Sequence, residues 1–336
     1  MPPFFCLFSL IYFLQFSNQS LKMAIYGSIQ TRNHGYGRRM DYAGKKVLES
    51  RFGGGHFSSV ASHSERWSAF SVWAKKNGIS DMREIKSETL NQYAEHMRST
   101  GLATATMHNR ISTINVILSH AREGAWRIIS PKELIGESRS QVRTEPPRML
   151  DRDAYSAALN DLKSAGLDRA AAVLGLAREF GMRSEEAVKA DLDRIEKEAT
   201  SRGEINVIDG TKGGRDAPRW VPVTNDGRAA LRAALDARPE GSRNLLRPGE
   251  SYREWRAGEL KAGRDMLHAH GARGFHESRA AYACERYREL TGHEAPVVAG
   301  ARGAERATDR AAREVIAAEL GHGRADVARS YVGSSR

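Results

Sequence analysis

The chain has 336 residues, and its 52 lysines and arginines against 41 acidic residues give a formal net charge of +11. This length allows two domains and a sizeable core. A charge of this sign and size favours a polyanionic partner, nucleic acid before a membrane surface. The two cysteines, Cys6 and Cys284, are far apart and form no metal-binding or disulfide pattern, which excludes a disulfide-stapled domain. The expected compartment is a reducing cytoplasm.

Residues 1–22 contain an apolar run from Phe4 to Phe16, which is shorter than the roughly 20 residues of a membrane helix. No basic residue precedes the run, and no small-residue cleavage site follows it. The run could be a weak membrane anchor. We favour instead a translation start at Met23, with residues 1–22 as a doubtful extension outside the fold prediction.

Residues 23–60 are rich in Gly, Arg, Lys and Tyr, and they include the sequence GYGRR and a triple glycine. This composition predicts a flexible basic arm. Such an arm could follow DNA phosphates or could simply keep the chain soluble.

Residues 61–135 have the periodicity of a helical domain. Trp67, Phe70 and Trp73 recur at three-residue spacing and predict one face of a first helix. A second helix is expected between Ser87 and Gly101. A third is indicated by regularly spaced apolar residues, namely Met107, Ile111, Ile114 and Leu118. The prediction is a small helical core DNA-binding domain whose aromatic residues are core rather than base-stacking platforms.

Residues 136–150 are polar and contain two consecutive prolines, which break a helix and indicate an interdomain linker. Asp151 then caps a helix of a second domain, 151–336, and a further helix is expected from about 168 to 179. Alternating residues predict strands at 204–208 and 219–223, around the turn-rich sequence DGTKGG. The fold class is therefore mostly α with a small β-hairpin (α+β). No Rossmann or P-loop glycine pattern appears.

Cleavage of a DNA strand without a metal needs fixed cations around the phosphate, a nucleophile and a general acid. Arginine suits the first task because its planar group stays charged and donates two parallel hydrogen bonds. The second domain offers such groups in four separate stretches. The candidates are Arg183 after Gly-Met, Lys212 between the strands, the pair His276 and Arg279, His322 after Leu-Gly, and Tyr331 nine residues later.

Four motifs in this order resemble the tyrosine recombinases, the phage integrase family: GMRSEEAVKADL, IDGTKGGRDAPRWVPV, HESRAAYA and LGHGRADVARSYVG. Each motif alone is weak, but their order and the closing His-to-Tyr spacing are specific. The resemblance covers roughly residues 60–336. It implies a helical core-binding domain and a catalytic domain that close around duplex DNA.

The resemblance also implies a role for each matching residue. Arg183 and Arg279 would clamp the phosphate, His276 would assist proton transfer, and His322 would hydrogen-bond the phosphate. Lys212 would protonate the leaving 5′-oxygen, with Arg215 and Arg219 nearby. Tyr331 would form a 3′-phosphotyrosyl bond, favoured as a phenolate by the surrounding positive charge. Glu186 matches a buried structural glutamate.

The implied function is site-specific DNA recombination that integrates or excises a mobile element through a Holliday junction. The expected partners are double-stranded DNA, a homo-tetramer assembled on two sites, and DNA-bending accessory proteins. No cofactor, metal or membrane is expected, and the location would be the nucleoid in the cytoplasm. Two alternatives stay open: a catalytically silent DNA-binding protein of the same fold, and a type IB topoisomerase or telomere resolvase. Residues 292–306 are predicted to be an insertion.

Overall fold

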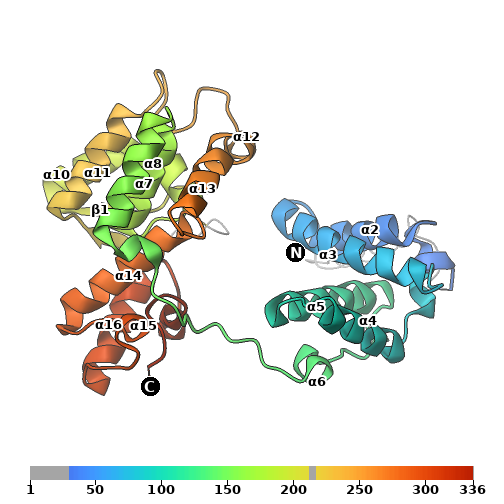
Figure 1. Cartoon of the computed structure of the whole chain (residues 1–336). Helices are drawn as coiled ribbons and strands as arrows, with labels where there is room; N and C mark the ends of the chain where they lie inside the picture. Colours follow the sequence, from blue (N-terminus) through green and yellow to red (C-terminus); the bar gives the residue numbers. More distant parts are fainter. Residues whose placement is uncertain (1–29, 212–216, 336) are drawn as a thin grey trace, which may run out of the picture. The chain divides into compact units, whose positions relative to one another are not determined.

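The computed structural model describes residues 30–211 and 217–335. The chain divides into two compact units, residues 1–140 and 141–336, and the boundary falls within the segment that was predicted to be the linker (Figure 1). The described residues are mostly helical and contain one small two-stranded sheet, which confirms the predicted fold class. Lys212 and the apolar run at 4–16 lie outside the described residues. No helix in the described ranges is long and apolar enough to span a membrane.

The first unit is a helical bundle around an aromatic core. Its elements are η1 (Arg32–Gly35), α2 (Met40–Phe52), α3 (Phe57–Lys76), η2 (Met82–Glu84), α4 (Ser87–Ser99), α5 (Thr104–Ala121) and α6 (Pro131–Ile135). The α3 residues Trp67, Phe70 and Trp73 are buried, as predicted. Phe70 meets Tyr93 of α4 edge-on, with the ring centroids 5.0 Å apart.

The prediction of a flexible arm over residues 23–60 is wrong from η1 onward. Helix α2 buries Met40, Ala43, Gly44, Val47 and Leu48, whose i, i+3, i+4, i+7 and i+8 spacing places them on one face. Gly44 lets α2 approach α3 closely, because a Cβ atom there would lie only 2.0 Å from the Trp67 indole nitrogen. The prediction relied on the glycine and basic content of this segment and overlooked the regular spacing of its apolar residues.

The second unit is a larger helical assembly with the sheet on one side. Its elements are η3 (Arg148–Leu150), α7 (Arg152–Ser164), α8 (Asp168–Phe180), α9 (Ser184–Lys189), α10 (Leu192–Arg202), β1 (Glu204–Asn206), β2 (Trp220–Pro222), α11 (Asn225–Asp236), α12 (Tyr252–Ala257), α13 (Glu259–Ala269), α14 (His276–Thr291), α15 (Pro296–Ala299), α16 (Arg306–Glu319), η4 (Ala325–Ala328) and α17 (Arg329–Val332). Helix α8 runs through the middle, with 12 of its residues from Arg169 to Phe180 buried.

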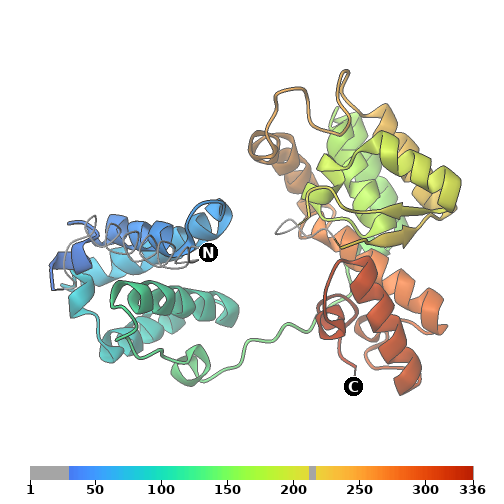
Figure 2. The ribbon, with the colours of Figure 1, turned by 180° about the vertical axis from the view of Figure 1, so that it is seen from behind.

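The sheet and the C-terminal helices lie around the candidate residues of this unit. Strands β1 and β2 are antiparallel, and Ile205 pairs with Val221. They are shorter than the predicted 204–208 and 219–223. The C-terminal helices lie beside α14 in both views (Figures 1 and 2). The segment predicted to be an insertion, 292–306, contains α15, and its Val297 belongs to the core of the unit.

Candidate active site

The first candidate, Arg183, lies where α8 turns into α9. Gly181 adopts a left-handed conformation, with φ of +61°, and ends α8. Arg183 is the residue before α9, and its backbone N–H donates to Oε2 of Glu186 at 2.7 Å. Its Nη1 atom also donates to Oε1 of Glu186, at 2.5 Å. The guanidinium is therefore fixed at one side, and the side chain remains 28% exposed.

His276 and Arg279 lie three residues apart at the start of α14, so their side chains share one face. Arg279 is completely buried. It donates to the carbonyl oxygen of Gly181, at the end of α8, and to that of Leu320, at 2.5 Å. This one side chain therefore ties three helix ends together.

The sequence Leu-Gly-His ends α16 in a specific turn. The N–H of His322 donates to the carbonyl of Ala317 at 2.7 Å, and that of Gly321 donates to the carbonyl of Ala318 at 2.8 Å. Gly321 has φ of +65°. This pair of bonds is the Schellman motif, which requires a residue in the left-handed region. The turn directs His322 back toward α14.

The Tyr331 hydroxyl lies between the side chains of Arg279 and His322. Nε of Arg279 donates to it at 3.2 Å, and Nε2 of His322 lies 3.1 Å from it. The His276 ring is also close, with its centroid 5.5 Å from that of Tyr331. Tyr331 itself is only 4% exposed. The structure thus brings together five of the six candidates, and the sixth, Lys212, lies outside the described residues.

These contacts assign the protonation of His322. Arginine can only donate hydrogen bonds, and Nη2 of Arg279 lies 3.4 Å from Nε2 of His322. Nε2 is therefore the acceptor, and we place the imidazole proton on Nδ1. The Tyr331 O–H then has Nε2 as an acceptor.

Both histidines are neutral near pH 7. Burial and the charges of Arg279 and Arg183 lower the pKa of His276 to about 4, although part of the residue is exposed. Burial and the same arginines lower the pKa of His322 to about 4. His322 therefore does not contribute to the positive charge that was expected around Tyr331, because a neutral imidazole is a proton acceptor instead.

A buried carboxylate balances the arginines. Glu186 is completely buried. Burial alone would raise its pKa, but the guanidiniums of Arg219, Arg279 and Arg183 outweigh that effect and hold the pKa below its usual value. Arg219 lies 2.9 Å from Oε2 of Glu186, and Arg279 lies 3.6 Å from it.

These groups open into a cavity of about 610 Å³. It is lined by residues from five segments of the second unit: Arg183, Glu186, Val207, Thr211, Ala217, Pro218, Arg219, Ala318, Gly321, His322 and Tyr331. Thr211 and Ala217 flank the segment 212–216, so Lys212 follows a cavity-lining residue directly in the chain. The cavity offers the part-exposed guanidinium of Arg183 and the hydroxyl of Tyr331 to an anion. No cluster of His, Cys, Asp or Glu in the described ranges could hold a metal ion.

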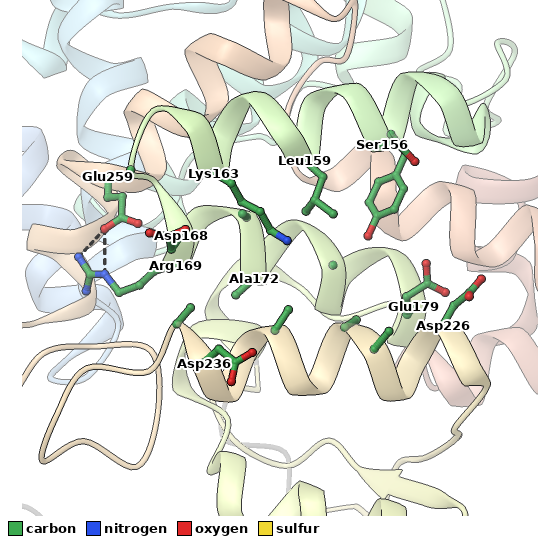
Figure 3. A pocket seen from close by; sticks show the side chains of 18 of the residues that line it. Ser156, Leu159, Lys163, Asp168, Arg169, Ala172, Glu179, Asp226, Asp236 and Glu259 are labelled. Atoms are coloured by element: carbon green, nitrogen blue, oxygen red, sulfur yellow. Dashed lines mark hydrogen bonds and ion pairs between the residues drawn. The ribbon is translucent and has the colours of Figure 1, made fainter.

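A larger cavity, of about 880 Å³, lies elsewhere between α7, α8 and α11 (Figure 3). Its walls carry alanines and charged residues, some of which are paired with one another. Arg169 bonds Glu259 at 2.8 Å, and Arg152 bonds Glu179 at 2.8 Å. None of the candidate residues lines it. Size alone therefore does not identify the site.

Sequence reasoning missed the part played by Arg219. It stood only as a basic neighbour of Lys212, whereas the structure buries it against Glu186. Its position at the edge of a strand that also contains the buried Val221 was the available signal.

Comparisons with known proteins agree with this architecture. A family model described as Integrase matches residues 138–285. The structure resembles the Tn1549 transposon integrase in complex with transposon right end DNA, with a TM-score of 0.58 and 11% identity, over 89% of this chain and 96% of that one. It also resembles a lambda integrase dimer bound to a COC′ core site, with a TM-score of 0.56 and 15% identity, over 87% of this chain and 93% of that one.

A lambda integrase tetramer bound to a Holliday junction matches with a TM-score of 0.50 and 15% identity, over 84% of this chain and 72% of that one. At these identities the likeness establishes the fold alone. No curated protein matches the sequence.

Proposed function

We propose that the chain belongs to the integrase family of tyrosine recombinases and that it cleaves and rejoins DNA strands at specific sites through a covalent bond to Tyr331. The observation that carries this proposal is the hydroxyl of Tyr331, which is held between Arg279 and His322 in a cavity that Arg183 also lines. A nucleophile, a proton acceptor and two cations thus share one site.

The proposed first step is attack of the Tyr331 oxygen on the scissile phosphorus. A 3′-phosphotyrosyl bond forms, the bond from phosphorus to the 5′-oxygen breaks, and the hydroxyl proton passes to Nε2 of His322, 3.1 Å away. Arg183 and Arg279 would stabilise the charge that develops on the non-bridging oxygens. Lys212 is proposed to protonate the leaving 5′-oxygen, and His276 to assist.

Rejoining reverses these steps with a 5′-hydroxyl from another strand. Because the phosphotyrosyl bond conserves the energy of the phosphodiester, the reaction needs no ATP. Exchange between two sites requires four cleavages, and we propose a homo-tetramer that passes through a Holliday junction. DNA-bending proteins are proposed as further partners, and the nucleoid as the location. The context would be integration or excision of a mobile element.

Most of the DNA affinity should come from phosphate contacts with the basic surface of this chain. The logarithm of the binding constant should then fall linearly with the logarithm of the salt concentration, by about 0.9 for each phosphate contacted in duplex DNA. Filter binding across a series of salt concentrations would measure this slope.

The deciding experiment is a covalent trap. The protein is mixed, with EDTA present, with nicked suicide duplexes drawn from the DNA that flanks its own gene, and the products are run on a denaturing gel. Tyr331→Phe is run in parallel. The control is Tyr252→Phe, which removes the hydroxyl of a half-buried tyrosine that does not line the cavity.

We expect a protein–DNA band with the wild type and the control but not with Tyr331→Phe. A band that survives Tyr331→Phe would overturn the assignment of the nucleophile. DNA binding without any band would favour a catalytically silent DNA-binding protein. Relaxation of supercoils without recombination would favour a type IB topoisomerase.

A further inference from the structure

We propose that Arg219 is a positioning residue of this active site: it holds Glu186 and the two helix ends next to Arg183 and His322 in the arrangement that cleavage needs. This inference rests on the proposed function and deepens it.

Arg219 has a fixed backbone and a buried side chain. Its N–H donates to Oδ1 of Asn206 at 2.8 Å, and its carbonyl accepts from the N–H of Val207 at 2.9 Å. These bonds extend the β1–β2 pairing to the residue before β2. The side chain is only 4% exposed, so Arg219 is not available to a DNA phosphate from solvent. Its partners are all within the protein.

The guanidinium of Arg219 contacts two helix ends. Nε donates to the carbonyl of Glu319, the last residue of α16, at 2.6 Å. Nη2 donates to the carbonyl of Gly181 at 3.3 Å, the same carbonyl that accepts from Arg279. Glu319 lies three residues before His322, and Gly181 lies two before Arg183. Arg219 therefore joins the turns that present both of these residues.

Arg219 also fits against the turn itself. A Cβ atom at Gly321 would lie 3.2 Å from Cδ and 3.3 Å from Nη1 of Arg219. The stem of Arg219 thus packs on the glycine of the Schellman motif that directs His322. Shortening the side chain would remove this support as well as the hydrogen bonds.

The charge of Arg219 has a second consequence. Its Nη1 atom lies 2.9 Å from Oε2 of Glu186, a carboxylate that Arg183 and Arg279 also contact. If Arg219 were neutral, the full negative charge of Glu186 would be balanced by Arg183 and Arg279 alone. Both would then offer less positive potential to a phosphate. Arg219 keeps these two arginines available.

The test measures the single-turnover rate at which the full chain forms the covalent adduct on a suicide duplex at saturating protein. Arg219→Met keeps the length of the side chain and removes its charge. We expect DNA affinity within a few-fold of the wild type and cleavage slower by up to about 100-fold, because a misplacement of reacting groups by about 1 Å can cost that much. Arg219→Lys should be intermediate.

The matched control is Arg178→Met. Arg178 is as deeply buried as Arg219, pairs with Glu285 at 2.5 Å, and does not line the cavity. Its loss should lower stability but leave the cleavage rate of folded, DNA-bound protein within a few-fold of the wild type. If Arg178→Met slows cleavage as much as Arg219→Met, the effect of Arg219 is general destabilisation and the inference fails.

A rescue experiment tests the electrostatic part. In the background of Arg219→Met, the further change Glu186→Gln removes the carboxylate that is left underbalanced, so the double variant should cleave several-fold faster than Arg219→Met alone. A double variant no faster than Arg219→Met would overturn the charge-balancing role. Wild-type cleavage by Arg219→Met would overturn the whole inference. Absence of any adduct with the wild type would instead refute the proposed function.

Discussion

The clearest stability prediction concerns Glu186. Its carboxylate is completely buried and accepts two hydrogen bonds from Arg183, at 2.7 and 2.5 Å. Arg219 and Arg279 lie 2.9 and 3.6 Å from it. Glu186→Gln conserves the size of the side chain but leaves these three guanidiniums without their anion. Removing one partner from a buried ion pair costs about 3–5 kcal/mol.

The adjacent glutamate gives a matched control. Glu185 is 42% exposed and pairs with Lys189 one helical turn away, at 2.6 Å. An exposed pair of this kind contributes about 0.5 kcal/mol or less. Because a unit of this size shifts its Tm by about 2–4 °C for each kcal/mol, Glu186→Gln should lower the Tm by about 6–20 °C. Glu185→Gln should lower it by about 2 °C at most.

Differential scanning calorimetry of the full chain at pH 7 would measure both shifts. Equal shifts in the two variants would refute the reasoning that Glu186 balances buried charge. The pH dependence follows from the lowered pKa of Glu186. A carboxyl whose folded pKa is depressed adds stability above its unfolded pKa, about 4.3, and loses it as the pH falls through the folded pKa. The advantage of the wild type over Glu186→Gln should therefore shrink below about pH 4.

Three further predictions follow from the site. Chemical denaturation should show that Gly181→Ala lowers the free energy of unfolding by about 1–3 kcal/mol more than Gly203→Ala does. Both glycines have a positive φ, but of the two only Gly181 would bring a Cβ atom into a clash, 2.7 Å from Leu320. Equal losses in the two variants would contradict this reasoning. The pKa values of His276 and His322 are about 4, so the rate of adduct formation should vary little between pH 6 and 8. A tenfold fall in this rate from pH 7 to pH 6 would show that one of the two histidines titrates in that range. Their depressed pKa values also predict that the free energy of unfolding falls as the pH drops below about 6.5.

The sequence predicted the elements whose signals are local. Asp151 was expected to cap a helix, and its side chain accepts from the backbone N–H groups of Asp153 and Ala154. The spacing of Trp67, Phe70 and Trp73 predicted a buried helix face. In both cases the deciding interactions lie within about one helical turn, so the sequence alone contains them.

The rest depends on contacts between distant residues. Arg219 follows a Gly-rich stretch and suggests a solvated arginine, but a carbonyl 100 residues away in the chain, that of Glu319, accepts its Nε hydrogen bond and fixes it inside the protein. The burial of α2 likewise depends on Trp67, whose indole donates to the carbonyl of Met40 at 2.8 Å. Neither partner can be chosen from composition or spacing.

The hydrogen bonds of Arg279 constrain how a phosphate can bind. A guanidinium has five N–H groups. In Arg279 four of them are directed at the carbonyls of Gly181 and Leu320, the hydroxyl of Tyr331 and Nε2 of His322. The two carbonyl bonds hold helix ends and must persist if the site is to keep its shape.

A phosphate oxygen that Arg279 clamps with two donors must therefore take over at least one bond that Arg279 now makes to Tyr331 or His322. Loss of the Tyr331 bond would separate its oxygen from a cationic donor, whereas loss of the His322 bond would leave Nε2 of His322 free to accept the hydroxyl proton. In the proposed mechanism, the same change in the hydrogen bonds of Arg279 would bind the phosphate and activate Tyr331. In this proposed role, the burial of Arg279 has a use: its fixed carbonyl bonds determine which N–H groups a phosphate can reach.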